Sequence, residues 1–192
     1  MTAAEGGAAR ILRFEDLQVS RWANGLGETR ELAAYRTTDG ALVWRLSIAT
    51  IAAASDFSAL SGVDRRLMNL GDGPLSLVVG DDPVTVPRRE VVSFRGEDAV
   101  RALHANGYDL NVMTGRGRAT SSLETVSVDG SVTFAAGAST MLTIVVLDGK
   151  TAVRTGDHAF HLPPLDSLVA ALGDDVTVDG DATVAVVRIA MT

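Results

Sequence analysis

The chain has 192 residues, which is enough for one well-buried core or two closely merged sub-domains and argues against two independent domains. Its net charge of -7 and pI near 4.9 argue against nucleic-acid or anionic-membrane partners, because both need a basic surface. The absence of cysteine excludes disulfides and thiolate chemistry. Residues 1–10 are small and polar, so we expect a disordered start, neither signal peptide nor membrane span, on a cytoplasmic protein.

Short strand-like segments separated by turns fill the first part of the chain. A glycine-punctuated loop at residues 22–32 leads into a strand that ends near Arg36, and Asp39-Gly40 then predicts a hairpin. A strand is expected at residues 43–51, and residues 56–67 pass through a turn into another strand that ends near Leu70. Further strands are expected at residues 75–79, 84–86, 91–94, 100–104 and 108–114. Short strands at such regular spacing are typical of a sandwich or a barrel.

The second part of the chain continues this pattern. Strands are expected at residues 123–128, 132–135, 141–147, 151–154, 159–162, 168–172, 176–178 and 184–190. Asp129-Gly130 and Asp148-Gly149 predict hairpins, and only residues 165–172 could instead form two helical turns. Segments at 75–103 match segments at 142–172, which indicates two similar barrels; chance similarity among valine-rich strands is the alternative. The sequence therefore predicts an all-β fold.

The strand at residues 43–51 organises the N-terminal part. Its alternation places apolar side chains on one face, namely Trp44, Leu46 and Ile48, and on the other face Arg45, Ser47 and Ala49. A strand this apolar is a poor edge strand, so its polar face is expected to line a pocket, a barrel lumen or an ion pair. A face open to water is the alternative. The strand at 108–114 places on one face Asp109, Asn111 and Met113.

Several motifs in order resemble the HutD/Ves family, whose members have a double-barrel cupin fold. The matching segments are residues 22–31, 44–51, 57–58 with 62–65, and 109–113. Leu26 and residues 56–58 and 60–62 depart from the usual family residues, which affects loop shape. The resemblance covers roughly residues 10–118 by motif and the rest by fold. It implies one bicupin unit of two antiparallel jelly-roll-like barrels, with residues 11–118 as the N-terminal half and 119–192 as the C-terminal half.

Metal and nucleophile chemistry find little support in the sequence. Cupin enzymes usually hold a metal with two closely spaced histidines, a carboxylate and a further histidine. None of the three histidines, His104, His158 and His161, has a partner two residues away, and residues three apart on a strand face opposite ways. No histidine lies in the motifs that contain the candidate hydroxyls, so we expect no metal, no cofactor and no catalytic residue.

The remaining constellation suits a small anion. Arg45 and Arg65 are candidate clamps, because the planar guanidinium donates two parallel hydrogen bonds to a carboxylate. The candidate hydrogen-bonding groups are Ser47, Ser58, Asn24, Thr29 and Asn111; the candidate walls are Trp22, Phe57 and Met113; the carboxylates are Asp109 and Glu31. Structural roles are the alternative: Arg45 paired with Asp109, Arg65 with Asp64 or Glu31, Asn24 in a turn, and the tryptophans in the core.

The first hypothesis is therefore a metal-free, non-catalytic bicupin that binds a small anionic metabolite as a regulator or sensor. The HutD resemblance implies a link to histidine utilisation, with N-formylglutamate, formiminoglutamate or urocanate as ligand, whereas the Ves branch implies a stress response. The second hypothesis is a cupin isomerase or hydrolase that uses Glu31 or Asp109 as acid or base. A structural interaction module would instead show an apolar surface patch. The sequence leaves open whether the protein forms a homodimer.

Overall fold

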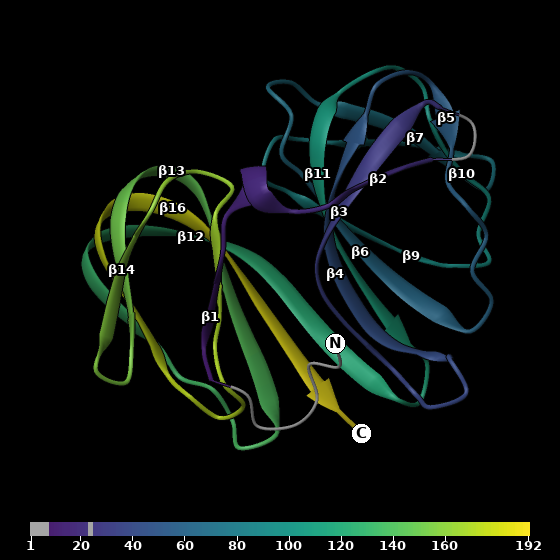
Figure 1. Cartoon of the computed structure of the whole chain (residues 1–192). Coiled ribbons are helices and arrows are strands. Elements are labelled where there is room, and N and C mark those ends of the chain that lie inside the picture. Colours follow the sequence, from purple (N-terminus) through teal and green to yellow (C-terminus); the bar gives the residue numbers. More distant parts are fainter. Residues whose placement is uncertain (1–7, 23–24) are drawn as a thin grey trace. The chain divides into compact units, whose positions relative to one another are not determined.

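The computed structural model describes residues 8–22 and 25–192, and most of its strands are labelled in Figure 1. It confirms the all-β fold class: the described residues form antiparallel strands and one 3-10 turn, η1 (Phe14–Asp16). No helix in the described ranges is long and apolar enough to cross a membrane. The chain divides into a central unit, Gln18–Arg118, and a terminal unit, which joins the described residues up to Leu17 with Ala119–Thr192.

The central unit contains two antiparallel sheets. The six-stranded sheet has the order β2 (Val19–Arg21), β3 (Gly27–Arg36), β4 (Leu42–Ile51), β11 (Gly107–Gly115), β6 (Val63–Asn69), β9 (Val91–Arg95). The four-stranded sheet has the order β5 (Ser55–Asp56), β10 (Val100–Ala102), β7 (Leu75–Val79), β8 (Asp82–Val86). The predicted hairpin at Asp39-Gly40 is confirmed, because residues 37–41 join β3 to β4 and Gly40 has a φ of 86°.

The core of the central unit draws on both of its sheets. Its buried members are Ile51, Leu67, Leu75, Leu77, Val86, Phe94, Val100 and Ala102. In β7 the leucines are buried while Ser76 and Val78 between and after them are only partly so, which is the period-two pattern expected of a strand with one face on a core. Burying each such leucine stabilises the fold by about 1.5–3 kcal/mol.

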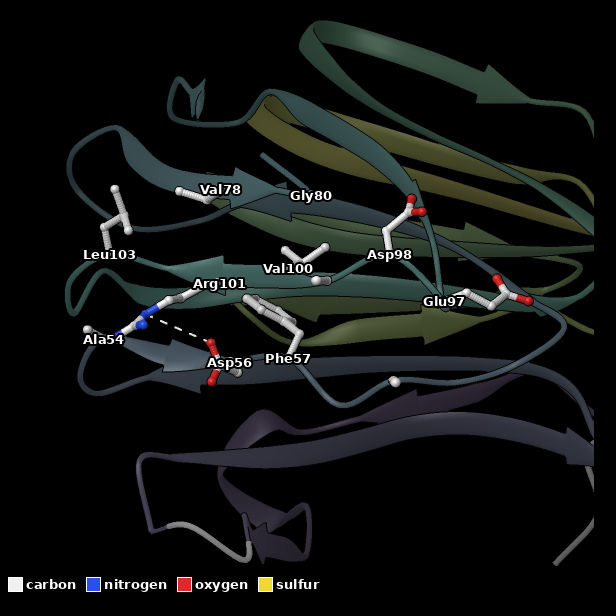
Figure 2. A pocket seen from close by; sticks show the side chains of 12 residues that line it. Ala54, Asp56, Phe57, Val78, Gly80, Glu97, Asp98, Val100, Arg101 and Leu103 are labelled. Atoms are coloured by element: carbon white, nitrogen blue, oxygen red, sulfur yellow. Dashed lines mark ion pairs between the residues drawn. The ribbon is translucent and has the colours of Figure 1, made fainter. Parts of the chain in front are cut away.

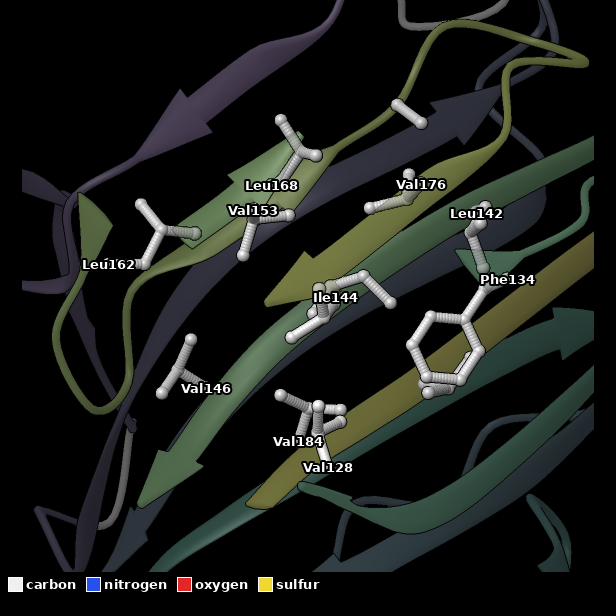
Figure 3. Close-up of a cluster of buried hydrophobic side chains, with 13 residues drawn as sticks. Val128, Phe134, Leu142, Ile144, Val146, Val153, Leu162, Leu168, Val176 and Val184 are labelled. Atoms are coloured by element: carbon white, nitrogen blue, oxygen red, sulfur yellow. The ribbon is translucent and has the colours of Figure 1, made fainter. Parts of the chain in front are cut away.

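The terminal unit is a single six-stranded sheet. Its main order is β1 (Arg10–Leu12), β15 (Ser167–Val169), β13 (Thr140–Thr155), β16 (Val176–Met191), β12 (Ala119–Phe134), and β14 (His158–Leu162) pairs with β13. Figure 3 shows the side chains that meet inside it, among them Ile144, Val153, Leu168 and Val184. This unit therefore has a valine-rich hydrophobic core of its own.

Two of the predicted hairpins are wrong. Asp129 and Gly130 lie within β12, opposite Asp181 and Gly180 of β16 in an unbroken ladder. Asp148-Gly149 likewise lies within β13, where the register to β16 shifts between Val146 and Asp148. The positive φ that lets glycine reverse a chain also lets it bend a strand at a bulge, and long-range pairing decides between the two. Residues 165–172 form β15 and not helical turns, because β1 and β13 pair with that strand on both sides.

The glycines within these long strands give a matched pair of substitutions. Gly130 and Gly149 have φ values of 91° and 86°, where an L side chain is strained by about 1–2 kcal/mol. A Cβ at Gly130 meets nothing within 4 Å, whereas one at Gly149 would lie 2.3 Å from the carbonyl oxygen of Asp181. We expect Gly149→Ala to lower the free energy of unfolding clearly more than Gly130→Ala in urea denaturation. Equal losses would contradict the close approach at Gly149.

The beginning of the described chain pairs with the terminal unit and not with the central one. The sequence grouped residues 11–17 with the N-terminal half, but β1 pairs with β15, and Asp166 accepts a 2.8 Å hydrogen bond from the backbone N–H of Phe14. Arg13 adds a 2.6 Å ion pair to Asp166. Disorder was expected up to residue 10, yet Arg10 is already in β1; residues 1–7 lie outside the described ranges. A three-residue strand whose partner lies more than 150 residues away leaves no local pattern.

The internal similarity in the sequence corresponds to a shared arrangement of three strands. In the central unit β10 pairs with both β5 and β7, and in the terminal unit β15 pairs with both β1 and β13. The matching strands are β7 with the first part of β13, and β10 with β15. The units differ beyond this point, because β7 turns directly into β8 whereas β13 continues past its bulge.

Candidate functional site

The register of three neighbouring strands gathers the predicted polar residues on one face of the central unit. Ser47 of β4 lies opposite Asn111 of β11, and Arg45 lies opposite Met113. Met113 in turn lies opposite Arg65 of β6. Directly opposite residues in an antiparallel sheet project to the same side with Cβ atoms about 4.5–5.5 Å apart. The alternation in β4 therefore places its polar face, as expected, on a shared wall.

This wall borders a cavity of about 410 Å³. Nine of the predicted residues line it: Trp22, Thr29, Arg45, Ser47, Phe57, Ser58, Arg65, Asn111 and Met113. Ser20, Ala49, Asp56 and Leu60 line it too, and only Ala49 lies on a face that the alternation pointed to. Ser20 belongs to a three-residue strand opposite Thr29, too short for a readable pattern. Asn24 lies outside the described residues.

Arg45 forms an ion pair with Glu31 and not with Asp109, so that alternative pairing is wrong. Its Nε lies 2.9 Å from Oε2 of Glu31, but the angle is not that of a hydrogen bond. Glu31 lies opposite Ser47 in the ladder between β3 and β4, so the carboxylate stands beside the cavity wall. The two side chains are 25 % and 46 % exposed, so water screens this pair and weakens the attraction.

Arg65 is the deeply buried cation of the site and is only 5 % exposed. Its guanidinium carbon lies 5.1 Å from the ring centroid of Phe57 and 4.9 Å from that of Phe94, within range of a cation–π interaction with both. Nη2 donates a 3.2 Å hydrogen bond to Oδ1 of Asn111, and Nε has no hydrogen-bond partner in the part of the chain that is described. Arg65 thus retains donor capacity beside the cavity, and the pairings with Asp64 or Glu31 are not found.

Asp109 is fully buried and does not itself line the cavity. Its Oδ1 accepts a hydrogen bond from Nδ2 of Asn111, while no described residue bonds to its Oδ2. Burial raises the pKa of Asp109 from 3.8 to about 7, although the nearby charge of Arg65 acts to lower it. Burial likewise lowers the pKa of Arg65 to about 10, and the charge of Asp109 opposes this. Asp109 is therefore partly protonated near neutral pH.

Trp22 forms the aromatic side of the cavity together with Phe57. Its Nε1 donates a 2.8 Å hydrogen bond to Oγ1 of Thr29, and its ring centroid lies 6.3 Å from that of Phe57. Gly27 allows this packing, because a Cβ there would lie 2.7 Å from the indole of Trp22 and 2.5 Å from the carbonyl oxygen of Thr50. The glycine serves close approach of the indole to the strand.

The donors around the cavity do not fit a metal centre of the cupin type. They are two guanidinium groups, hydroxyls and one amide, with Asp56 as the carboxylate, and cations repel a metal ion. The three histidines lie elsewhere and are exposed, with His158 and His161 on β14 and His104 after β10. Within residues 8–22 and 25–192, no three His, Cys, Asp or Glu side chains cluster closely enough to hold a metal ion.

A second hollow also borders Asp56 and Phe57. Figure 2 shows this groove of about 650 Å³, with Phe57 and Val100 at its apolar centre. Nε of Arg101 lies 3.8 Å from Oδ1 of Asp56 in an exposed ion pair, drawn as a dashed line. Asp56 and Phe57 line both hollows, so the segment that contains them is a wall shared by the cavity and the groove.

Comparison with known proteins places the chain in a family. The model of the HutD family matches residues 14–187. Among curated relatives, Protein Ves of Citrobacter koseri and Protein Ves of Cronobacter sakazakii are each 37 % identical over 106 residues, or 53 % of this chain. These matches cover 56 % and 58 % of the two relatives, so the chain spans little more than half the length of the curated proteins it matches.

Solved structures agree with this assignment at the level of the fold. A conserved protein of unknown function, PA5104 of Pseudomonas aeruginosa PAO1, superimposes with a TM-score of 0.83 at 25 % identity, covering 96 % of this chain and 99 % of its own. HutD of Pseudomonas fluorescens SBW25, in a formate condition, gives 0.82 at 23 % identity, covering 96 % and 100 %. A cupin barrel protein of Leptotrichia buccalis gives 0.59 at 13 % identity, covering 100 % of both chains. The predicted resemblance is confirmed, and the chain belongs to the HutD family.

Proposed function

We propose that the central unit binds a small metabolite through its carboxylate in the 410 Å³ cavity, and that the protein acts as a cytoplasmic regulator or sensor. The observation that carries this proposal is Arg65, a guanidinium 5 % exposed with an unpartnered Nε beside the cavity. Burying a cation and leaving a donor unsatisfied is unfavourable. A ligand carboxylate at the guanidinium would offset the buried charge.

The chemistry of the lining supports a carboxylate over other ligands. Ser47 and Asn111 lie opposite each other, two residues along their strands from Arg45 and Met113, and they add a hydroxyl and an amide to the lining. A planar guanidinium fits a carboxylate with two parallel hydrogen bonds. Trp22, Phe57 and Met113 supply apolar contact for the rest of a ligand. The volume lies in the usual range of about 300–1,000 Å³ for small-molecule sites.

The charge balance at the cavity also favours an anion. Glu31 offsets the charge of Arg45 through the ion pair. Asp109 offsets that of Arg65 only in part, because burial raises the pKa of Asp109 to about 7 and so favours its neutral form. The carboxylate of the lining, Asp56, pairs with Arg101, so the guanidinium of Arg65 is the lining charge that is only partly offset.

Membership of the HutD family motivates the choice of ligands to test. We propose N-formylglutamate, formiminoglutamate or urocanate, each a small carboxylate of a size that the cavity accommodates, and thereby a role in histidine utilisation. The alternative that we propose for the same binding site is the stress-response role expected of the Ves branch, because the chain is also similar to Protein Ves. Screening these ligands by melting temperature separates the first role from the second.

Arg45→Ala tests the site directly. Loss of a charge-assisted hydrogen bond of about 1.5–3 kcal/mol should weaken carboxylate binding roughly 10- to 100-fold in a calorimetric titration. The fold should survive, because a partly exposed ion pair contributes only about 0–1 kcal/mol. Arg188→Ala is the matched control: Arg188 and Glu124 pair in the terminal unit at 30 % and 52 % exposure. Equal affinity losses in both variants would contradict the assignment of the cavity.

Asp109 supports a second candidate function, an isomerase or hydrolase. A pKa of about 7 and an unpartnered Oδ2 suit a group that exchanges protons near neutral pH. Against this, Asp109 reaches the cavity only through Asn111. The two functions separate in one experiment, in which the candidate ligands are incubated with the protein and followed by NMR. An enzyme converts one of them and Asp109→Asn abolishes the conversion, whereas a sensor leaves all unchanged.

A further inference from the structure

We infer that anion binding in the cavity is coupled to uptake of one proton by Asp109, so that the site senses pH together with its ligand. This inference rests on the proposed function and adds its regulation. The connection is a chain of three side chains, in which Arg65 donates to Oδ1 of Asn111 at 3.2 Å and Asn111 donates to Asp109. All three are buried, so their charges interact with little screening from water.

Arg65 is the charged group that acts on Asp109. The residues opposite Asp109 on the flanking strands are Ala49 of β4 and Asn69 of β6, neither of which titrates. The amide of Asn69 is already engaged, because Nδ2 donates to the carbonyl oxygens of Gly73 and Val86. Its Oδ1 accepts from Asn106 and from the backbone of Gly71. Arg45 acts on the pKa of Arg65 and Glu31 pairs with Arg45, so both reach Asp109 only indirectly.

Two opposing effects therefore set the protonation of Asp109. Burial disfavours its charged form, and the guanidinium of Arg65 favours that form. An anion bound at Arg65 offsets the positive charge that favours ionisation, so the pKa of Asp109 rises and the carboxylate takes up a proton. Protonation of Asp109 in turn leaves the charge of Arg65 free for the ligand. Each event strengthens the other by the same factor, as linkage requires.

The direction of the pH dependence follows. Below the pKa of free Asp109, about 7, the proton is already bound and affinity should not change with pH. Above it, binding must add the proton, and affinity should fall by up to about tenfold per pH unit. A site in which Asp109 is only structural would bind equally well across this range.

The experiment is a calorimetric titration with N-formylglutamate at pH 6, 7 and 8, in two buffers of different ionisation enthalpy. The carboxyl groups of N-formylglutamate have ordinary pKa values near 3.5–4.3, so the ligand does not titrate between pH 6 and pH 8. We expect binding several-fold to tenfold weaker at pH 8 than at pH 7, with close to one proton taken up per ligand at pH 8. Binding with neither proton uptake nor pH dependence would overturn the coupling and leave the proposed function standing.

Asp109→Asn identifies the group. Asparagine keeps the shape and the acceptor for Asn111 but cannot ionise, so binding should be independent of pH and as tight at pH 8 as wild type at pH 6. Asp82→Asn, an exposed position on β8, is the control and should keep the wild-type pH dependence. A pH dependence that persists in Asp109→Asn would overturn the assignment, and the proton count on wild type stands if the variant does not fold. Absence of binding by all three candidate ligands at every pH would overturn the proposed function and the coupling together.

Discussion

Arg65→Met is expected to lower the free energy of unfolding by about 3 kcal/mol at pH 8 and by distinctly less at pH 5. Methionine fills much of the space between Phe57 and Phe94 but removes the charge that faces Asp109. An ionised Asp109 then lies buried without compensation, a change worth about 3–5 kcal/mol. Proton uptake by Asp109 keeps the loss at the low end of that range.

The pH dependence comes from Asp109. Its folded-state pKa, about 7, lies above the ordinary 3.8, so the native state binds the proton more tightly than the unfolded state. The stability that this group contributes is therefore complete below about pH 4, declines as the pH rises to about 7, and is lost above. At pH 5 Asp109 is mostly protonated, and removing Arg65 strands little charge.

Urea denaturation of wild type and of Arg65→Met at pH 5 and at pH 8 measures the loss of stability at each pH. Adding Asp109→Asn to Arg65→Met should remove most of the difference between pH 5 and pH 8, because no ionisable group then remains at that position. A loss of equal size at both pH values would mean that Arg65 stabilises the fold by packing alone, without an electrostatic interaction with Asp109.

Ile144→Ala is expected to lower the free energy of unfolding by about 2–5 kcal/mol and to leave ligand affinity unchanged. Ile144 is fully buried in the core of the terminal unit, at the centre of Figure 3, so its removal leaves a cavity among well-packed side chains. Every residue that lines the proposed ligand cavity belongs to the central unit. Stability and binding should therefore separate.

Leu67→Ala is the matched substitution in the central unit. Leu67 is also fully buried, and it lies opposite Asn111 in the ladder between β6 and β11. Its removal should lower stability by a similar amount, and it should also weaken binding, because Asn111 loses the neighbour that fixes its position. Affinities are compared by titration at a temperature where both variants are folded. An equal loss of affinity in both variants would contradict the independence of the cavity from the terminal core.

The wall of the cavity could be predicted because it depends on local alternation. Period two in β4 and β11 is enough to place Arg45 with Ser47, and Asp109 with Asn111, on common faces. The family motifs then brought in the loop residues Trp22 and Phe57, for which no periodicity exists. All nine lining residues that were predicted came from one of these two sources.

The partners of the charged residues could not be predicted in the same way. Alternation gives the face of a side chain but not its depth, and Asp109 on β11 is fully buried while Glu31 on β3 is half exposed. This difference in depth gives Arg45 an exposed partner and leaves Arg65 with a buried one. The prediction of a disordered start and the predictions of hairpins at the two Asp-Gly pairs were wrong for a related reason, since a strand far away in the sequence decides each of them.

A crystal structure of the protein with N-formylglutamate, formiminoglutamate or urocanate tests the central claim most directly. We predict a ligand carboxylate in the central unit, within hydrogen-bond distance of Arg45 or Arg65, with Ser47 or Asn111 as a further contact and the body of the ligand against Trp22 and Phe57. A ligand found instead in the groove beside Arg101, or a cavity without ligand at saturating concentrations of all three, would contradict it.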